Sequence, residues 1–225
     1  MTTTTYREKL DRFAENGLDQ PAMSPMEPPP AYDLQKPMEV AFENYSLPLQ
    51  ALIKEHEHFV SKLEEFEKAL MTFKETQFKL TAPISNAFAG FFRMVGEEMT
   101  RHHTKEEKML FPVLKKHLIE NGESNHSQWP TTPCDVMEDD HQVLMITTSL
   151  VMNLLGIATK LTDERSQYVL FHYAYEQAKE AVESLRLHIF KENHVLFPLA
   201  QELLTVDEMK LFKNNIDLFD GSTTK

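Results

Sequence analysis

Apolar residues recur at intervals of three and four positions along four long segments of the chain. These segments cover approximately residues 46–78, 84–119, 136–160 and 164–203. Such spacing places the apolar side chains along one face of an α-helix. Four helices of this length, joined mostly by short turns, favour an antiparallel bundle. The pattern therefore predicts an all-α fold with a four-helix bundle at its centre.

Start signals and prolines refine the limits of these helices. Thr81 and Pro83 stand at the beginning of the second segment, and Asp163 stands before the fourth. Short polar side chains cap helix starts, and proline is tolerated in the first turn. Pro112 and Pro198 instead lie late in the second and fourth segments, where a proline removes a backbone donor. We expect a kink or a local interruption at each.

The parts of the chain outside the bundle are short. Thr5 and Glu8 have the spacing of a capping box, and a proline-rich stretch follows them. Thr205 and Glu208 repeat this spacing near the other end of the chain. The predicted domains are a short N-terminal helix with a proline-rich arm over 1–37, the four-helix bundle over 38–204, and a short C-terminal helix and tail over 205–225.

The two halves of the predicted bundle share a repeat. HHTKEEKMLFP begins at His102 and HIFKENHVLFP begins at His188, so both read His-x-x-x-Glu-x-x-x-Leu-Phe-Pro. An acid followed by a histidine precedes each motif at nearly the same distance. These upstream pairs are Glu55-His56 and Asp140-His141. Each half is thus a helical hairpin that carries His and then His-x-x-x-Glu, and the bundle consists of two duplicated hairpins.

The repeated polar residues point toward the predicted core. Residues four apart share a helix face, so His102 lies with Glu106, and His188 lies with Glu192. Those faces are otherwise apolar, and burying unpaired carboxylates would cost several kcal/mol per charge. One such pair alone is usually a solvated contact on a helix surface. Its duplication in register favours a bound cation.

The chemistry of these side chains limits the metal. Four imidazoles and two carboxylates form a mixed nitrogen and oxygen donor set, which suits iron, manganese or zinc rather than calcium or copper(I). Two carboxylates that can bridge favour a pair of metal ions. Cys134 is the only cysteine, which excludes a thiolate-only site and an intrachain disulfide and fits a reducing compartment.

With these motifs the sequence resembles the hemerythrin-like family, also called the HHE cation-binding domain. Helices of that family carry His, His-x-x-x-Glu, His and His-x-x-x-Glu in this order, and the resemblance covers about residues 46–203. It implies two iron ions bridged by the glutamates and bound from outside by the histidines. The ligands carried over by position are His56, His102, Glu106, His141, His188 and Glu192.

One position departs from the pattern of the oxygen-carrying members. They place a second histidine one turn after the first on the third helix, and here that residue is Met145. His103 should point about 100° away from His102 on an ideal helix, so we do not expect it to replace the missing ligand. Each iron would then have about five ligands and one vacancy. The remaining histidines, expected to have no part in the site, are His58, His117, His126, His172 and His194.

The resemblance implies a protein that binds or senses oxygen or a related small oxidant. The alternative is a di-iron redox enzyme that reduces or disproportionates peroxide, oxygen or nitric oxide, which two adjacent vacancies would favour. Whether the protein is an enzyme stays open, as does its oligomeric state. Repair of iron–sulfur clusters ranks below both, because relatives with that activity carry an N-terminal cysteine pair that this sequence lacks.

Charge and composition restrict the partners. The formal net charge of -12 disfavours binding to nucleic acids and to anionic membranes. The first residues lack the apolar core of a signal peptide, and we expect no segment to approach membrane-spanning length. We therefore expect a cytoplasmic protein without nucleic acid or membrane partners.

Overall fold

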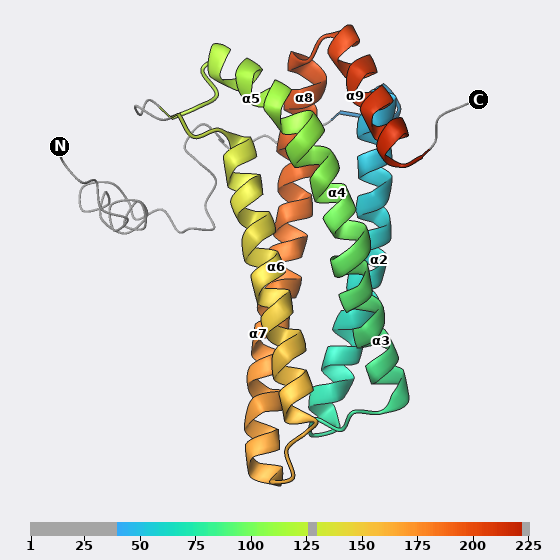
Figure 1. Ribbon diagram of the computed structural model, residues 1–225, viewed down its shortest axis with the longest axis vertical. Helices are drawn as coiled ribbons and strands as arrows, with labels where there is room; N and C mark the ends of the chain where they lie inside the picture. Colours follow the sequence, from blue (N-terminus) through green and yellow to red (C-terminus); the bar gives the residue numbers. More distant parts are fainter. Residues whose placement is uncertain (1–39, 126–129, 222–225) are drawn as a thin grey trace, which may run out of the picture. The chain divides into compact units, whose positions relative to one another are not determined.

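The computed structural model describes residues 40–125 and 130–221, which belong to one compact unit over Lys36–Lys225. Helices and the turns between them make up this part of the chain (Figure 1). The predicted N-terminal helix and proline-rich arm lie outside the described residues, as does His126. The predicted domain limits therefore stay predictions.

Four helical rods run antiparallel to one another and form the bundle (Figure 1). The all-α, four-helix prediction is confirmed, and each predicted segment corresponds to one rod. The rods are α2, Leu47–Glu75; α3, α4 and α5, Ala82–Arg93, Thr100–Lys105 and Phe111–Glu120; α6, Pro133–Ala158; and α7 with α8, Glu164–Lys191 and Phe197–Leu203. A short 3-10 turn, η2, Phe42–Asn44, precedes the first rod.

Short π-helical turns interrupt the second and fourth rods. They are η3, Met94–Met99; η4, Glu106–Leu110; and η5, Glu192–Leu196. The last two end directly before the Phe-Pro pairs of the repeat, and the phenylalanine N–H bonds the carbonyl five residues earlier. Such a turn takes in one extra residue and re-aims the side chains that follow. The predicted interruption near Pro112 and Pro198 is confirmed.

Side chains cap α7 and α9 as the sequence predicts, whereas Thr81 stands at the N-cap of α3 without a side-chain cap hydrogen bond. The Ser166 N–H donates to Asp163 Oδ2 at 2.8 Å at the start of α7. The last helix, α9, Val206–Phe219, begins with a capping box made by Thr205 and Glu208. The predicted C-terminal helix is therefore confirmed.

Two apolar clusters fill the bundle, and a polar layer separates them. Along α2, Leu49 and Leu52 belong to one cluster, Phe59 and Leu63 belong to the other, and His56 lies between them. The other three rods show the same order. We call the larger group the aromatic cluster; it includes Phe66, Phe73, Phe88, Phe91 and Phe171. We call the other the end cluster; it includes Phe111, Leu114, Phe197, Met209 and Phe212.

The apolar character of α6 corrects one expectation. Among the described helices, α6 alone is long and apolar enough to cross a membrane by length and composition. Its outer face carries the exposed side chains Val143, Ile146 and Leu150 in addition to its buried face, which raises its hydropathy. The same criteria select core helices of bundles. Here α6 packs along α7 and places His141 in the polar layer.

Candidate metal centre

Seven buried side chains from the four rods meet in the polar layer. They form two groups in which one donor atom from each member lies within 4.8 Å of the others. Site A consists of His56, His102, Glu106 and Glu192, and site B consists of His103, His141 and His188. The structure thus brings together all six residues expected as ligands and adds His103.

Each of the two glutamates faces histidines of both sites. The Glu106 carboxylate places Oε1 3.2 Å from His102 Nε2 and Oε2 3.5 Å from His141 Nε2. The Glu192 Oε2 atom lies 3.1 Å from His56 Nε2 and 3.2 Å from His188 Nε2. A carboxylate in such a position can bridge two metal ions. This arrangement fits the resemblance better than two independent sites would.

The contacts in the layer have the spacing of ligands around an ion. His56 Nε2 lies 2.9 Å from His102 Nε2, and two ligands about 2.1 Å from one ion at a right angle are about 3 Å apart. Both oxygens of Glu106 and Glu192 are buried and, among the described residues, have no hydrogen-bond partner. Leaving them so would be costly. The donor set therefore fits a bound cation.

The outer ring nitrogens of four histidines face acceptors. Three lie 2.8 Å from an oxygen, and the fourth approaches one at 3.9 Å. The pairs are His56 with Asn193, His102 with Glu55, His141 with Glu107, and His188 with Asp140. A histidine that donates from Nδ1 keeps the Nε2 lone pair for a metal ion. These acceptors therefore orient the rings toward the centre.

The repeat extends to these supporting residues. Glu55 also accepts from Lys105 Nζ at 2.6 Å, and Asp140 accepts from Lys191 Nζ at 2.8 Å. Both lysines are buried and stand directly before Glu106 and Glu192. The two hairpins are thus related by an approximate twofold symmetry in both the candidate ligands and the residues that support them. Sequence reasoning missed the lysines, although His-x-x-Lys-Glu occurs in both motifs.

Residues 47–200 match the family described as the Hemerythrin HHE cation binding domain. The chain belongs to this family. It is also 30% identical over 104 residues to the iron-sulfur cluster repair protein YtfE of Salmonella newport (strain SL254) and of Salmonella agona (strain SL483). That similarity covers 46% of this chain and 42% of each relative, so the chain spans less than half of their length.

His103 occupies a position in this HHE domain that the sequence did not predict. Its side chain is only 6% exposed, and its ring stacks on His141 with the centroids 3.6 Å apart. The sequence predicted that His103 points about 100° away from His102 and therefore has no part in the site. In the structure this direction leads to site B, so His102 and His103, adjacent on α4, belong to different sites. Met145 packs against the aromatic cluster instead.

Charge in the layer favours cations. Burial opposes a charged His102, but the carboxylates of Glu106 and Glu55 outweigh it and raise its pKa to about 10. Glu192 and Asp140 likewise outweigh burial and raise the pKa of His188 to about 9. Protons and metal ions compete for the same lone pairs. The potential that holds these protons would therefore also attract a metal ion.

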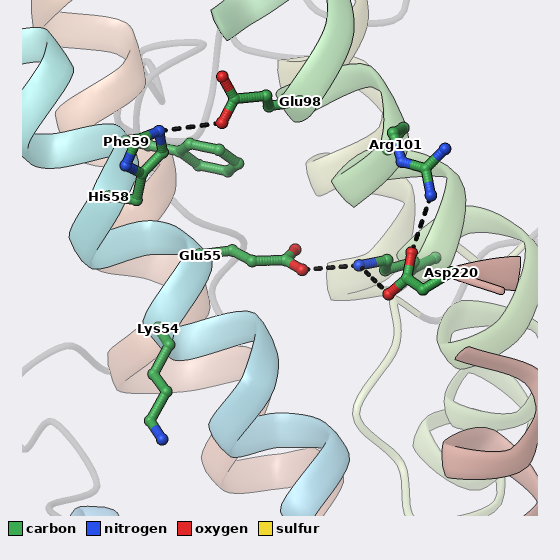
Figure 2. A pocket seen from close by; sticks show the side chains of 8 residues that line it. Lys54, Glu55, His58, Phe59, Glu98, Arg101 and Asp220 are labelled. Atoms are coloured by element: carbon green, nitrogen blue, oxygen red, sulfur yellow. Dashed lines mark hydrogen bonds and ion pairs between the residues drawn. The ribbon is translucent and has the colours of Figure 1, made fainter. Parts of the chain in front are cut away.

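A cavity of about 480 Å³ lies beside site A (Figure 2). Its lining includes Glu55, which holds His102, and Phe59, whose ring edge packs against His102 with the centroids 5.2 Å apart. Lys105 lies between Glu55 and Asp220, at 2.6 and 2.9 Å. Figure 2 shows Glu55 reaching across the cavity from α2 toward this cluster. The four residues of site A do not line the cavity themselves; Glu55 and Phe59 lie between it and His102.

Proposed function

We propose that this HHE domain is a non-haem di-iron protein that binds oxygen or a related small oxidant. The observation that carries the proposal is the position of Glu106 and Glu192, which face histidines of both sites and have no other partner among the described residues. Nitrogen and oxygen donors without thiolate suit iron, and helical bundles are a known frame for carboxylate-bridged iron pairs.

When bound, a ferrous pair would supply electrons and open coordination positions. The chain's own residues hold and shield it. Glu55, Asp140, Glu107 and Asn193 orient the histidines. The aromatic and end clusters exclude bulk water from the layer on both sides. A low local dielectric strengthens the attraction between the carboxylates and a metal ion.

The test is reconstitution of the metal-free protein with ferrous ion in the absence of air. Metal analysis should give close to two iron atoms per chain, and Mössbauer spectra should show a coupled pair after oxidation. Glu106→Ala with Glu192→Ala should remove the second iron, whereas Met145→Leu should not. Full occupancy by a single zinc ion with no uptake of iron would contradict the proposal.

The second candidate function is a redox enzyme that reduces or disproportionates peroxide, oxygen or nitric oxide. The cavity lined by Glu55 and Phe59 favours it, because both side chains contact His102 and a small substrate held there would be one side chain away from site A. Mixing the di-ferrous protein with oxygen separates the two functions. A binding protein releases oxygen again under vacuum, whereas an enzyme consumes it in an oxygen electrode. For either function we propose a cytoplasmic location.

A further inference from the structure

One face of α6 presents a continuous row of apolar side chains outside the bundle. We call it the α6 stripe; it consists of Val143, Ile146, Leu150, Leu154 and Ile157. Four of these residues are exposed, Ile146 the most at 67%, and Leu154 is partly buried. On an ideal helix the five lie within about 80° of one another and extend over about 21 Å. The stripe is therefore one narrow seam rather than a set of scattered apolar residues.

The bundle does not use the α6 stripe for its own packing. In the part of the chain that the structure describes, none of the five residues belongs to the aromatic cluster or the end cluster. Residues 141–159 contain no Asp, Glu, Lys or Arg, although these types make up 26% of the chain. The exposed side of α2, by contrast, carries Glu57, Glu64 and Lys68. A contiguous exposed apolar surface usually marks an interaction site.

We propose that the α6 stripe packs against the α6 stripe of a second copy of this chain, antiparallel and across a twofold axis at Leu150. A twofold interface is self-complementary, because each contact occurs twice with the two copies exchanged. The intervals along the stripe are 3, 4, 4 and 3 residues, so they are the same in both directions from Leu150. The axis pairs Leu150 with itself, Val143 with Ile157, and Ile146 with Leu154. Intervals of three and four residues are also typical of the seam between two packed helices.

Charged residues at the two ends of the stripe favour the same arrangement. Asp139 is exposed one turn before Val143, and Lys160 is exposed in the turn that follows α6. Neither forms an ion pair among the described residues. Asp139 lies 11 residues before Leu150 and Lys160 lies 10 residues after it, so an antiparallel partner brings Lys160 of the second copy near Asp139. The twofold axis repeats this pair at the other end, whereas a parallel partner would bring like charges together.

The α6 stripe fits a second copy of the chain better than a membrane surface. Helices that lie on membranes are typically rich in Lys and Arg on their polar side, and α6 contains neither. The net charge of -12 also opposes binding to anionic headgroups. One pair of helices buries less than the area of about 800 Å² per partner that a standard interface needs. We therefore expect a dimer that dissociates on dilution.

Analytical ultracentrifugation of the full chain over a range of concentrations tests the proposal. The wild type should change from monomer to dimer as its concentration rises. Leu150→Glu should weaken this association at least about a hundredfold, because the axis brings two carboxylates together in an apolar seam. Met152→Glu is the matched control, since Met152 is also exposed on α6 but points about 160° away from Leu150. It should associate as the wild type does.

Three results would overturn the proposal. One is a wild type that stays monomeric at every concentration. Another is a dimer that Leu150→Glu weakens no more than Met152→Glu does. The third is a monomer that binds vesicles of phosphatidylcholine and phosphatidylglycerol and loses this binding in Leu150→Glu, which would assign the stripe to a membrane. Circular dichroism should show the same helix content in all variants, because the bundle does not pack against these side chains.

Disulfide cross-linking provides a second, independent measurement of the pairing. A residue on a twofold axis faces its own copy, so Leu150→Cys should form a covalent dimer with oxidised glutathione as the oxidant. Cys134, the only native cysteine, is buried and should not react. Met152→Cys should cross-link at least about tenfold more slowly, because the dimer raises the effective concentration only at the axis. Equal rates for the two variants would overturn the antiparallel pairing at Leu150.

Discussion

The aromatic cluster and the polar layer lie next to each other in the same four rods, yet different forces hold them together. In the aromatic cluster, Phe66 stacks on Phe91 at 4.0 Å, and Phe73 meets Phe88 and Phe171 edge-on at 5.5 and 5.2 Å. These contacts are complete within the chain. In the polar layer, the oxygens of the two glutamates face histidine nitrogens but have no hydrogen-bond partner among the described residues.

This difference indicates how the fold supports the site. Apolar clusters on both sides of the layer hold the rods together, so the ligands are positioned before any ion binds. Burying the layer is unfavourable, and the apolar clusters offset that cost in the metal-free protein. We therefore expect the metal-free protein to be folded, with the polar layer as the least stable part of the bundle.

The largest effect should come from the aromatic cluster. Phe73 is fully buried, and Phe73→Ala should lower the free energy of unfolding by about 3–5 kcal/mol, the usual cost of deleting a buried ring. The loss should be the same with and without metal, and iron content should not change. A loss confined to the metal-loaded form, measured by thermal unfolding, would mean that the two regions are coupled.

Removing the metal with a chelator should lower the stability by a comparable amount, independently of the aromatic cluster. Metal binding at a thousandfold excess over its Kd contributes about 4 kcal/mol, which corresponds to roughly 10 °C in Tm for a chain of this size. Glu106→Ala should abolish the difference in Tm between loaded and chelated protein. Phe73→Ala should leave that difference intact. If chelation lowers Tm equally in the Glu106 variant, the stabilising ion binds elsewhere.

Replacing the acids that support the histidines should have smaller effects. These replacements allow the two halves of the layer to be compared. Glu55→Gln and Asp140→Asn each remove a charge that pairs with a buried lysine and a ligand histidine. Each should weaken metal binding by about tenfold. Chelator competition would measure this, with Glu67→Gln as the control, because Glu67 pairs with exposed Arg186. An unchanged affinity in both variants would show that the acids serve only the fold.

Sequence patterns predicted the helices and the six central residues because both depend on regular spacing. Apolar periodicity located all four rods. The in-register repeat singled out the polar residues of the two motifs, which are His102, Glu106, His188 and Glu192. Residues three or four positions apart lie on the same side of a regular helix, and the bundle buries that side. The spacing in the sequence therefore indicates which residues are buried.

The positions of His103, of the residues that support the histidines and of the buried lysines could not be predicted from spacing along the sequence. The grouping of His103 with His141 and His188 depends on how three rods pack against one another. The supports of the histidines come from other helices, so Asn193 with His56 is a pairing between hairpins that only the packing reveals. The buried lysines were visible in the repeat, yet a lysine in a helical motif ordinarily lies in solvent.

The smallest predicted effect concerns Glu208, which lies outside the polar layer. It accepts from His117 Nε2 at 3.0 Å and from the Thr205 N–H at 2.8 Å. These bonds lower its pKa from 4.5 to about 2. The folded state therefore holds this carboxylate charged more strongly than the unfolded state does, and its stabilising contribution is present above pH 4.5. That contribution is lost as the pH falls toward 2.

Glu208→Ala should thus cost less than about 1 kcal/mol at neutral pH, as is usual for a helix cap or an exposed ion pair. Measured by denaturant unfolding of chelated protein, the difference from the wild type should shrink steadily as the pH is lowered below 4.5. Asp207→Ala is the control, because Asp207 pairs only with the exposed Lys210 among the described residues. Its effect at neutral pH should be smaller. Since neither residue touches the layer, adding metal should change neither difference; a metal-dependent effect of Glu208→Ala would show that α9 belongs energetically to the site.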